Sequence, residues 1–171
     1  VYKRQEEART DALTGLPNRR FFDERLASQL AFHQEAGKTL GLIALDLDRF
    51  KRINDTYGHN IGDLVLRDMG RLLNDLTRAS DMAARTGGEE FSVLVTDVAE
   101  HATLLEIAER IRTAVASHQF IGDSVAFGMT VSVGVAVSVP SDSAETLTKR
   151  ADEMLYHAKA AGRDQVVSRA G

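Results

Sequence analysis

The chain has 171 residues, of which 43% are hydrophobic and 27% are charged, and its formal net charge is −4. These values are typical of one globular domain with a sizeable core, and the negative charge argues against a broad surface for nucleic acid. The absence of cysteine excludes disulfides and thiolate metal sites, so any metal ion must be held by oxygen or imidazole. No apolar run approaches the ~20 residues of a membrane span, and the start shows no signal-peptide pattern.

Residues 1–10, VYKRQEEART, are mostly polar and charged. We expect them to be the end of a helix that connects to an upstream domain, with the domain itself formed by residues 11–171. Gly15 and Pro17 predict an irregular loop over residues 11–18.

Beyond this loop, the apolar residues alternate between helical and strand spacing. Helices are predicted over residues 19–36, on both sides of Gly58, over 104–115 and over 144–158, and strands over 40–45, 81–86, 91–95, 130–139 and 165–168. The pair Gly87-Gly88 between two of the strands predicts a β-hairpin. This order predicts an α/β (α+β) fold with a mixed, mostly antiparallel sheet of about five strands surrounded by helices.

Two carboxylates, Asp46 and Asp48, directly follow the predicted strand 40–45. Hard divalent cations prefer such oxygen ligands. Asp48 has a second interpretation, as the N-cap of the following helix, because Asp is a favoured capping residue. A calcium-binding EF-hand loop is excluded, since the required Gly and Glu are absent from the sixth and twelfth positions.

The segment Gly87-Gly88-Glu89-Glu90 combines a flexible turn with two adjacent acids. A glycine pair lets the backbone approach a ligand closely. The adjacent glutamates repel one another unless a cation or solvent separates them, so a cation site and a solvated turn are both compatible with this segment.

Two further groups have equally open interpretations. Asn54 and Asp63 can address the donor and acceptor edge of guanine, or can simply serve a helix–loop–helix junction. Lys159 and Arg163, near the end of the last predicted helix, can bind phosphates or can complement the helix dipole.

Together and in this order, these motifs closely resemble the GGDEF-domain diguanylate cyclases over nearly the whole chain. The resemblance rests on DALTGLPNRR at 11–20, the segments 46–51 and 54–63, GGEEF at 87–91, Lys159 and Arg163. It implies a fold like that of nucleotidyl cyclases and the polymerase palm, with a GGEEF β-hairpin.

The resemblance further implies that each domain binds one GTP and that two copies meet as a homodimer. Each 3′-hydroxyl then attacks the other nucleotide's α-phosphate, which yields cyclic di-GMP, a bacterial second messenger, and two pyrophosphates. Two Mg²⁺ (or Mn²⁺) ions per GTP site are implied, with Asp46, the Leu47 carbonyl, Glu89 and Glu90 as ligands. Glu89 is implied as the acceptor of the 3′-hydroxyl proton, with Lys51 and Glu90 as the other catalytic residues.

Substrate recognition follows the same resemblance. Guanine binding is implied for Asn54, His59 and Asp63, and the carboxylate of Asp63 favours GTP over ATP because adenine has no N1–H to donate. Phosphate binding is implied for Lys51, Lys159 and Arg163.

Residues 78–81, RASD, match the inhibitory RxxD motif of the family, with the expected five residues between Asp81 and Gly87. The resemblance implies that Arg78 and Asp81, with Arg110, bind cyclic di-GMP as an allosteric product inhibitor. The alternative is an ordinary surface ion pair at a helix end.

The resemblance also implies a cytoplasmic domain fused to an upstream sensory or dimerisation domain, and leaves open whether the parent protein is anchored in the bacterial inner membrane. We expect the isolated domain to be mainly monomeric and weakly active. Two rival functions remain at this point. One is a catalytically silent receptor for the nucleotide, and the other is a class III cyclase that makes cyclic AMP or cyclic GMP.

Overall fold

The computed structural model describes residue 4 and residues 8–169. The predicted connector helix at residues 1–10 therefore lies largely outside the described residues. Within them, the Ala8 amide donates to the Arg4 carbonyl at 3.0 Å, and Thr10 pairs with Pro17 in an isolated β-bridge. Across the described residues, no helix is long and apolar enough to cross a membrane.

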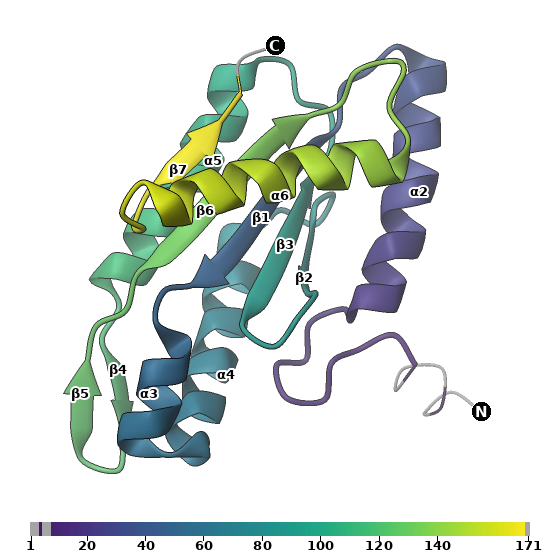
Figure 1. Cartoon of the computed structure of the whole chain (residues 1–171). Helices are drawn as coiled ribbons and strands as arrows, with labels where there is room; N and C mark the ends of the chain where they lie inside the picture. Colours follow the sequence, from purple (N-terminus) through teal and green to yellow (C-terminus); the bar gives the residue numbers. More distant parts are fainter. Residues whose placement is uncertain (1–3, 5–7, 170–171) are drawn as a thin grey trace.

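Helices and strands alternate along the chain (Figure 1). In order they are α2 (Arg19–Ala36), β1 (Gly41–Leu47), α3 (Phe50–Tyr57), α4 (His59–Leu76), β2 (Met82–Arg85), β3 (Glu90–Val95), α5 (His101–Ser117), β4 (Phe120–Gly122), β5 (Val125–Phe127), β6 (Val131–Val137), α6 (Ala144–Ala160) and β7 (Val166–Ser168).

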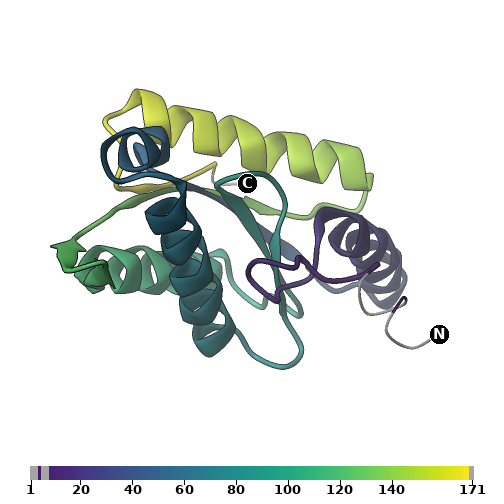
Figure 2. The ribbon, with the colours of Figure 1, turned by 90° about the horizontal axis from the view of Figure 1, so that it is seen from below.

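A five-stranded sheet in the order β2-β3-β1-β6-β7 forms the centre of the domain. Neighbouring strands are antiparallel except β6 and β7, which are parallel. The predicted mixed, mostly antiparallel sheet is therefore confirmed. Helix α6 lies on one face of the sheet, and α4 and α5 lie on the other (Figure 2).

Strand β1 is buried along its whole length because it lies in the middle of this sheet. Its side chains alternate between the two faces. Ile43 and Leu45 join the core with α4 and α5, whereas Leu42 and Ala44 join the core with α2 and α6. By the same alternation, Asp46 points to the α6 side.

Helix α6 packs very closely on strand β6, and a glycine makes this approach feasible. A Cβ atom on Gly134 would lie only 2.2 Å from the Leu155 amide nitrogen and 2.3 Å from the Ala151 carbonyl oxygen. The close contact brings the end of α6 down to the end of β1.

Strand β7 pairs with only part of β6, from Val133 to Val135. Past that point, the Val137 carbonyl accepts a hydrogen bond from the Arg150 guanidinium at 2.7 Å, and the Val139 amide donates to the Asp142 carboxylate at 2.8 Å. Arg150 and Asp142 are themselves paired at 2.6 Å. Side chains thus take the place of a neighbouring strand at the end of β6 and just beyond it.

The hairpin of β4 and β5 was not predicted from the sequence. Its strands have only three residues each, Ile121 is exposed, and the turn uses Asp123 and Ser124 in left-handed conformations with φ of 47° and 68°. Asp-Ser is not a strong turn signal of the Asn-Gly kind.

Candidate active site

The GGEE turn lies directly beside the carboxyl end of β1. Asp46 is opposite Glu90 in the β1–β3 register, and the Leu47 amide donates to the Glu89 carbonyl at 3.2 Å. The turn closes through two amides, of Thr86 and Gly87, that both donate to the Glu90 carbonyl. A Cβ on Gly87 would lie 2.8 Å from a carboxylate oxygen of Glu90, so glycine gives this side chain room at the turn.

The sequence had predicted that Asp46 follows the strand. In the structure it is instead the penultimate residue of β1. It is only 6% exposed, and its Oδ2 accepts a hydrogen bond from Lys159 Nζ at 2.6 Å. Burial raises the pKa of Asp46, the Lys159 ammonium opposes this rise, and the nearby charges of Glu89 and Asp48 add to it. The site thus holds several acids around one cation from α6.

Asp48 is not the N-cap of α3, which corrects one interpretation of the sequence. Arg49 occupies that position in a left-handed conformation and makes no side-chain capping bond. Asp48 is instead buried and accepts from the Thr130 hydroxyl at 2.7 Å, the Ser132 hydroxyl at 2.6 Å and the Asp164 amide at 3.1 Å. Partners on β6 and beyond α6 therefore outcompete the local cap.

The GGEE turn is held from outside by arginines that sequence reasoning missed. Arg85 donates to the Gly88 carbonyl from Nη2 at 2.9 Å and from Nε at 3.0 Å, and to Asp11 at 3.1 Å. Arg19 donates to the Thr86 carbonyl at 3.1 Å. Burial alone would raise the pKa of Asp11, but hydrogen bonds from Thr14 and the charge of Arg85 lower it. The only sequence signal for Arg85 was its place two residues before Gly87.

The bend between α3 and α4 at Gly58 places Asn54 against Gly62, the residue before Asp63. Asn54 and Asp63 are half-buried, whereas His59 is exposed at the first position of α4. A Cβ on Gly62 would lie 1.8 Å from the Asn54 side-chain oxygen, so this glycine makes room for the amide. The exposed Lys51 lies on the first turn of the same α3 helix.

Lys159 and Arg163, which were predicted to bind phosphates, lie in different environments. Lys159 is in the last turn of α6 and contacts Asp46, while Arg163 is exposed in the loop that follows. The Arg163 amide donates to the Ala158 carbonyl at 2.9 Å, which folds the loop back against the helix end.

The RxxD residues gather at the other end of β2 and β3. Arg78 donates to Asp81 from Nε at 2.9 Å and from Nη2 at 3.2 Å, and Asp81 also accepts from the Thr96 amide at 3.0 Å. Arg110 donates to the Leu76 carbonyl at 3.3 Å, immediately before this segment. The Arg78 side chain remains 60% exposed, while that of Asp81 is only 4% exposed.

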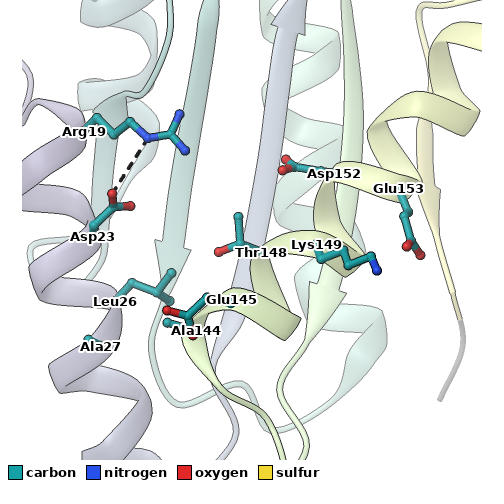
Figure 3. Close-up of a pocket in the computed structure, with 10 residues that line it drawn as sticks. All are labelled: Arg19, Asp23, Leu26, Ala27, Ala144, Glu145, Thr148, Lys149, Asp152 and Glu153. Atoms are coloured by element: carbon teal, nitrogen blue, oxygen red, sulfur yellow. Dashed lines mark ion pairs between the residues drawn. The ribbon is translucent and has the colours of Figure 1, made fainter.

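A groove of about 630 Å³ lies between α2 and α6, and none of the predicted site residues lines it (Figure 3). It is bordered by the ion pair of Arg19 with Asp23, at 3.8 Å, and by Asp152. Burial first, and then the charge of Glu90, raises the pKa of Asp152. Because Arg19 also donates to the Thr86 carbonyl, the groove lies next to the start of the GGEE turn.

A palm-like sheet with an acidic strand end and a glycine turn defines the class of domain, and the comparisons define its family. Residues 8–165 match the family described as diguanylate cyclase, GGDEF domain. The chain belongs to this family, as the sequence motifs had predicted.

Curated relatives are similar over nearly all of this chain. The response regulator PleD of Caulobacter vibrioides is 45% identical over 171 residues, which cover 96% of this chain and 37% of PleD. Diguanylate cyclase DgcP of Pseudomonas aeruginosa is 42% identical over 95% of this chain and 24% of DgcP. The chain thus spans well under half the length of these relatives.

Solved structures share the fold. The coiled coil and GGDEF domain of DgcB from Caulobacter crescentus, in complex with c-di-GMP, superposes with a TM-score of 0.94 at 34% identity, covering 98% of this chain and 89% of that one. Diguanylate cyclase SiaD in complex with its activator SiaC, from Pseudomonas aeruginosa, gives a TM-score of 0.91 at 36% identity, covering 98% and 64%. The predicted fold class is confirmed.

Proposed function

We propose that this domain condenses two GTP molecules into cyclic di-GMP with release of two pyrophosphates. The observation that carries the proposal is the register that sets buried Asp46 beside the GGEE turn, in a chain of the GGDEF family. The proposal covers residues 11–171 as the catalytic domain.

The donor set at this strand end fits a hard divalent cation. GGDEF diguanylate cyclases generally depend on a divalent metal ion. Asp46 and Glu89 supply carboxylates, with Glu90 and the Leu47 carbonyl nearby, and oxygen ligands suit Mg²⁺ or Mn²⁺. Among the described residues, no three ligating side chains converge, and Asp46 is paired with Lys159. When bound, two such ions would neutralise phosphate charge and favour departure of pyrophosphate.

The chain's own residues position the reacting groups. The new bond joins the 3′-oxygen of one nucleotide to the α-phosphorus of the other, and the bond from that phosphorus to the pyrophosphate oxygen breaks. In this proposal the half-buried Glu89 carboxylate accepts the 3′-hydroxyl proton, with Glu90 beside it. Lys51 and Arg163 attract the phosphates, and Lys159 exchanges its bond with Asp46 for one with phosphate.

Guanine recognition is assigned to Asn54 and Asp63, with His59 at the rim. The Asp63 carboxylate accepts from the N1–H and the exocyclic amine of guanine, groups that adenine does not offer in that arrangement. The half-buried setting of both side chains supports this role, because partial desolvation strengthens such hydrogen bonds.

Because each domain holds one nucleotide, the reaction needs a homodimer, and we propose that an upstream sensory or dimerisation domain supplies it. The GTP substrate places the domain in the cytoplasm, whether or not the parent protein is anchored in the bacterial inner membrane.

We further propose that Arg78, Asp81 and Arg110 bind cyclic di-GMP as an inhibitor. The geometry supports this site, since the exposed Arg78 guanidinium follows shortly after Leu76, whose carbonyl accepts a hydrogen bond from Arg110 on α5.

The test is incubation of the domain with GTP and Mg²⁺ over a range of protein concentrations, with products identified by mass spectrometry. We expect cyclic di-GMP at a rate that rises more steeply than protein concentration, and none from the Glu89→Gln variant. Failure of a coiled-coil fusion of the domain to produce cyclic di-GMP would overturn the proposal. Binding of GTP without turnover would then favour a receptor, and cyclic GMP as product would favour a class III cyclase.

A further inference from the structure

The loop that follows α6 bends through three consecutive residues with positive φ. The values are 119° at Gly162, 65° at Arg163 and 45° at Asp164. Glycine adopts such conformations readily, but a side chain disfavours them, and two such residues in a row persist only when their surroundings hold them. Local bonds of the Arg163 amide with Ala158 and of the Arg163 carbonyl with Gln165 help to hold this loop, and two contacts from outside it meet at Asp164.

The inner contact comes from Asp48, one residue beyond β1. Its Oδ2 accepts from the Asp164 amide at 3.1 Å and from the Thr130 hydroxyl at 2.7 Å, and its Oδ1 accepts from Ser132 at 2.6 Å. The carboxylate therefore accepts three hydrogen bonds, and it fixes the Asp164 backbone relative to β1 and β6.

The outer contact comes from Arg112 on α5, on the face of the sheet opposite α6. Its Nη1 donates to the Asp164 carboxylate at 2.7 Å, and its Nε donates to Glu109 at 2.9 Å. The Arg112 side chain is only 20% exposed, and these hydrogen bonds raise its pKa, so the guanidinium stays charged. Arg112 is thus held in one orientation by Glu109, and it holds the Asp164 side chain in turn.

We propose that Arg112 and Asp164 form a positioning pair that aims Arg163 at the terminal phosphate of the nucleotide. The inference rests on the proposed function, in which Arg163 contacts that phosphate. Asp164 is held at its amide by Asp48 and at its carboxylate by Arg112, so the preceding peptide has one orientation. Neither Arg112 nor Asp164 touches the nucleotide in this arrangement. They act only through Arg163.

The experiment measures the affinity for 3′-deoxy-GTP, which lacks the attacking hydroxyl, and for GDP, which lacks the terminal phosphate. Both are titrated calorimetrically with Mg²⁺ into the wild type, Arg112→Met and Arg163→Met. We expect Arg112→Met to weaken 3′-deoxy-GTP binding about fivefold to tenfold and GDP binding less than about twofold. Arg71→Met, which removes an exposed Arg–Asp pair on α4, is the matched control and should change neither affinity.

A double variant separates positioning from a general structural effect. If Arg112 acts through Arg163, Arg112→Met adds nothing in the Arg163→Met background. Additive losses, or an equal loss of GDP binding, would show a structural role only and overturn the inference. The pair Asp164→Ala and Asp164→Asn repeats the test at the other partner. The Asn variant still accepts from Arg112 and tolerates the left-handed conformation, so it should retain most of the affinity that the Ala variant loses.

The two proposals fail in different ways. If Arg163→Met weakens 3′-deoxy-GTP binding and Arg112→Met does not, the positioning pair is wrong and the proposed function stands. If Arg163→Met itself leaves 3′-deoxy-GTP binding unchanged, the phosphate role of Arg163 is wrong and the positioning pair is wrong with it.

Discussion

Beside each end of strands β2 and β3 lies an aspartate paired with a cation, Asp46 on β1 at one end and Asp81 just before β2 at the other, but the pairs are built differently. At the GGEE end, buried Asp46 has one cationic partner, Lys159, and burial raises its pKa. At the RxxD end, Asp81 accepts two bonds from Arg78 and others from Thr96, so its carboxylate is fully occupied. The first pair is suited to exchanging partners, and the second is suited to holding the backbone in place while presenting an exposed guanidinium.

The comparison predicts the largest effect at Asp46. We expect Asp46→Asn to lower the rate of cyclic di-GMP formation at least about 1,000-fold, because a ligand for the cation is lost. The midpoint of thermal unfolding should change little, since Lys159 can turn to solvent. Product quantification by mass spectrometry and a thermal melt check both points, and Asp123→Asn at the β4–β5 turn is the control. A rate close to wild type would remove Asp46 from the site.

The support of the GGEE turn should matter next. Arg85→Met removes the link between Asp11 and the Gly88 carbonyl, so the turn is expected to be less ordered and the cyclisation rate to fall about tenfold to 100-fold. Arg85→Lys should recover only part of the rate, because one ammonium cannot reproduce the planar fork. The measurement is the initial rate of cyclic di-GMP formation at saturating GTP for the wild type, Arg85→Met and Arg85→Lys. Equal rates for all three proteins would show that the turn holds its shape without Arg85.

Stability should separate the two members of the RxxD pair. Asp81→Ala leaves the buried Thr96 amide without its acceptor and should lower the free energy of unfolding by about 2–3 kcal/mol. Arg78→Ala removes a largely exposed side chain, and the buried Asp81 keeps its bonds from Thr96, so the loss should be smaller, about 1 kcal/mol. Urea denaturation measures both values. Equal losses would contradict the distinction drawn between the structural aspartate and the exposed arginine.

A smaller effect follows from acid titration of Asp142, whose bonds with Arg150 lower its pKa to about 2 from the usual 3.8. The folded-state pKa is depressed, so the stabilisation is present above pH 3.8 and is lost as the pH falls through about 2. It should amount to about 2 kcal/mol. Urea denaturation between pH 2 and pH 6 compares the wild type with Asp142→Asn. The variant should lack this part of the pH dependence.

The sequence predicts the fold well where local signals and burial agree. The apolar runs of β1 and β6 and the glycines of the GGEE turn each indicate their structure without help from distant residues. One of the two interpretations of Asp48, that it caps the following helix, was wrong, because this favourable local cap competed with Thr130, Ser132 and the Asp164 amide. Those partners are 82 to 116 positions away in the sequence.

In the candidate site, too, residues with a local sequence signal could be predicted, and contacts between distant residues could not. Asp46, Glu89, Asn54 and Asp63 could be named because their residue types and order carry the family resemblance. The bond between Asp46 and Lys159 joins residues 113 positions apart, and it depends on how closely α6 packs on β6. No local pattern encodes that distance. Arg85 was missed because an arginine on a short strand has no distinctive spacing.

The side chains that occupy the unpaired part of β6 affect how copies of the chain can associate. An open strand edge is a template for strand addition and for aggregation. Arg150 covers the Val137 carbonyl and Asp142 covers the Val139 amide, so an incoming strand would have to displace an ion pair before it could hydrogen-bond there. Continuous sheets across two molecules are thereby disfavoured at this edge. Encounters between copies are left to the other faces of the molecule, and these include the GGEE edge, where we propose that two domains meet.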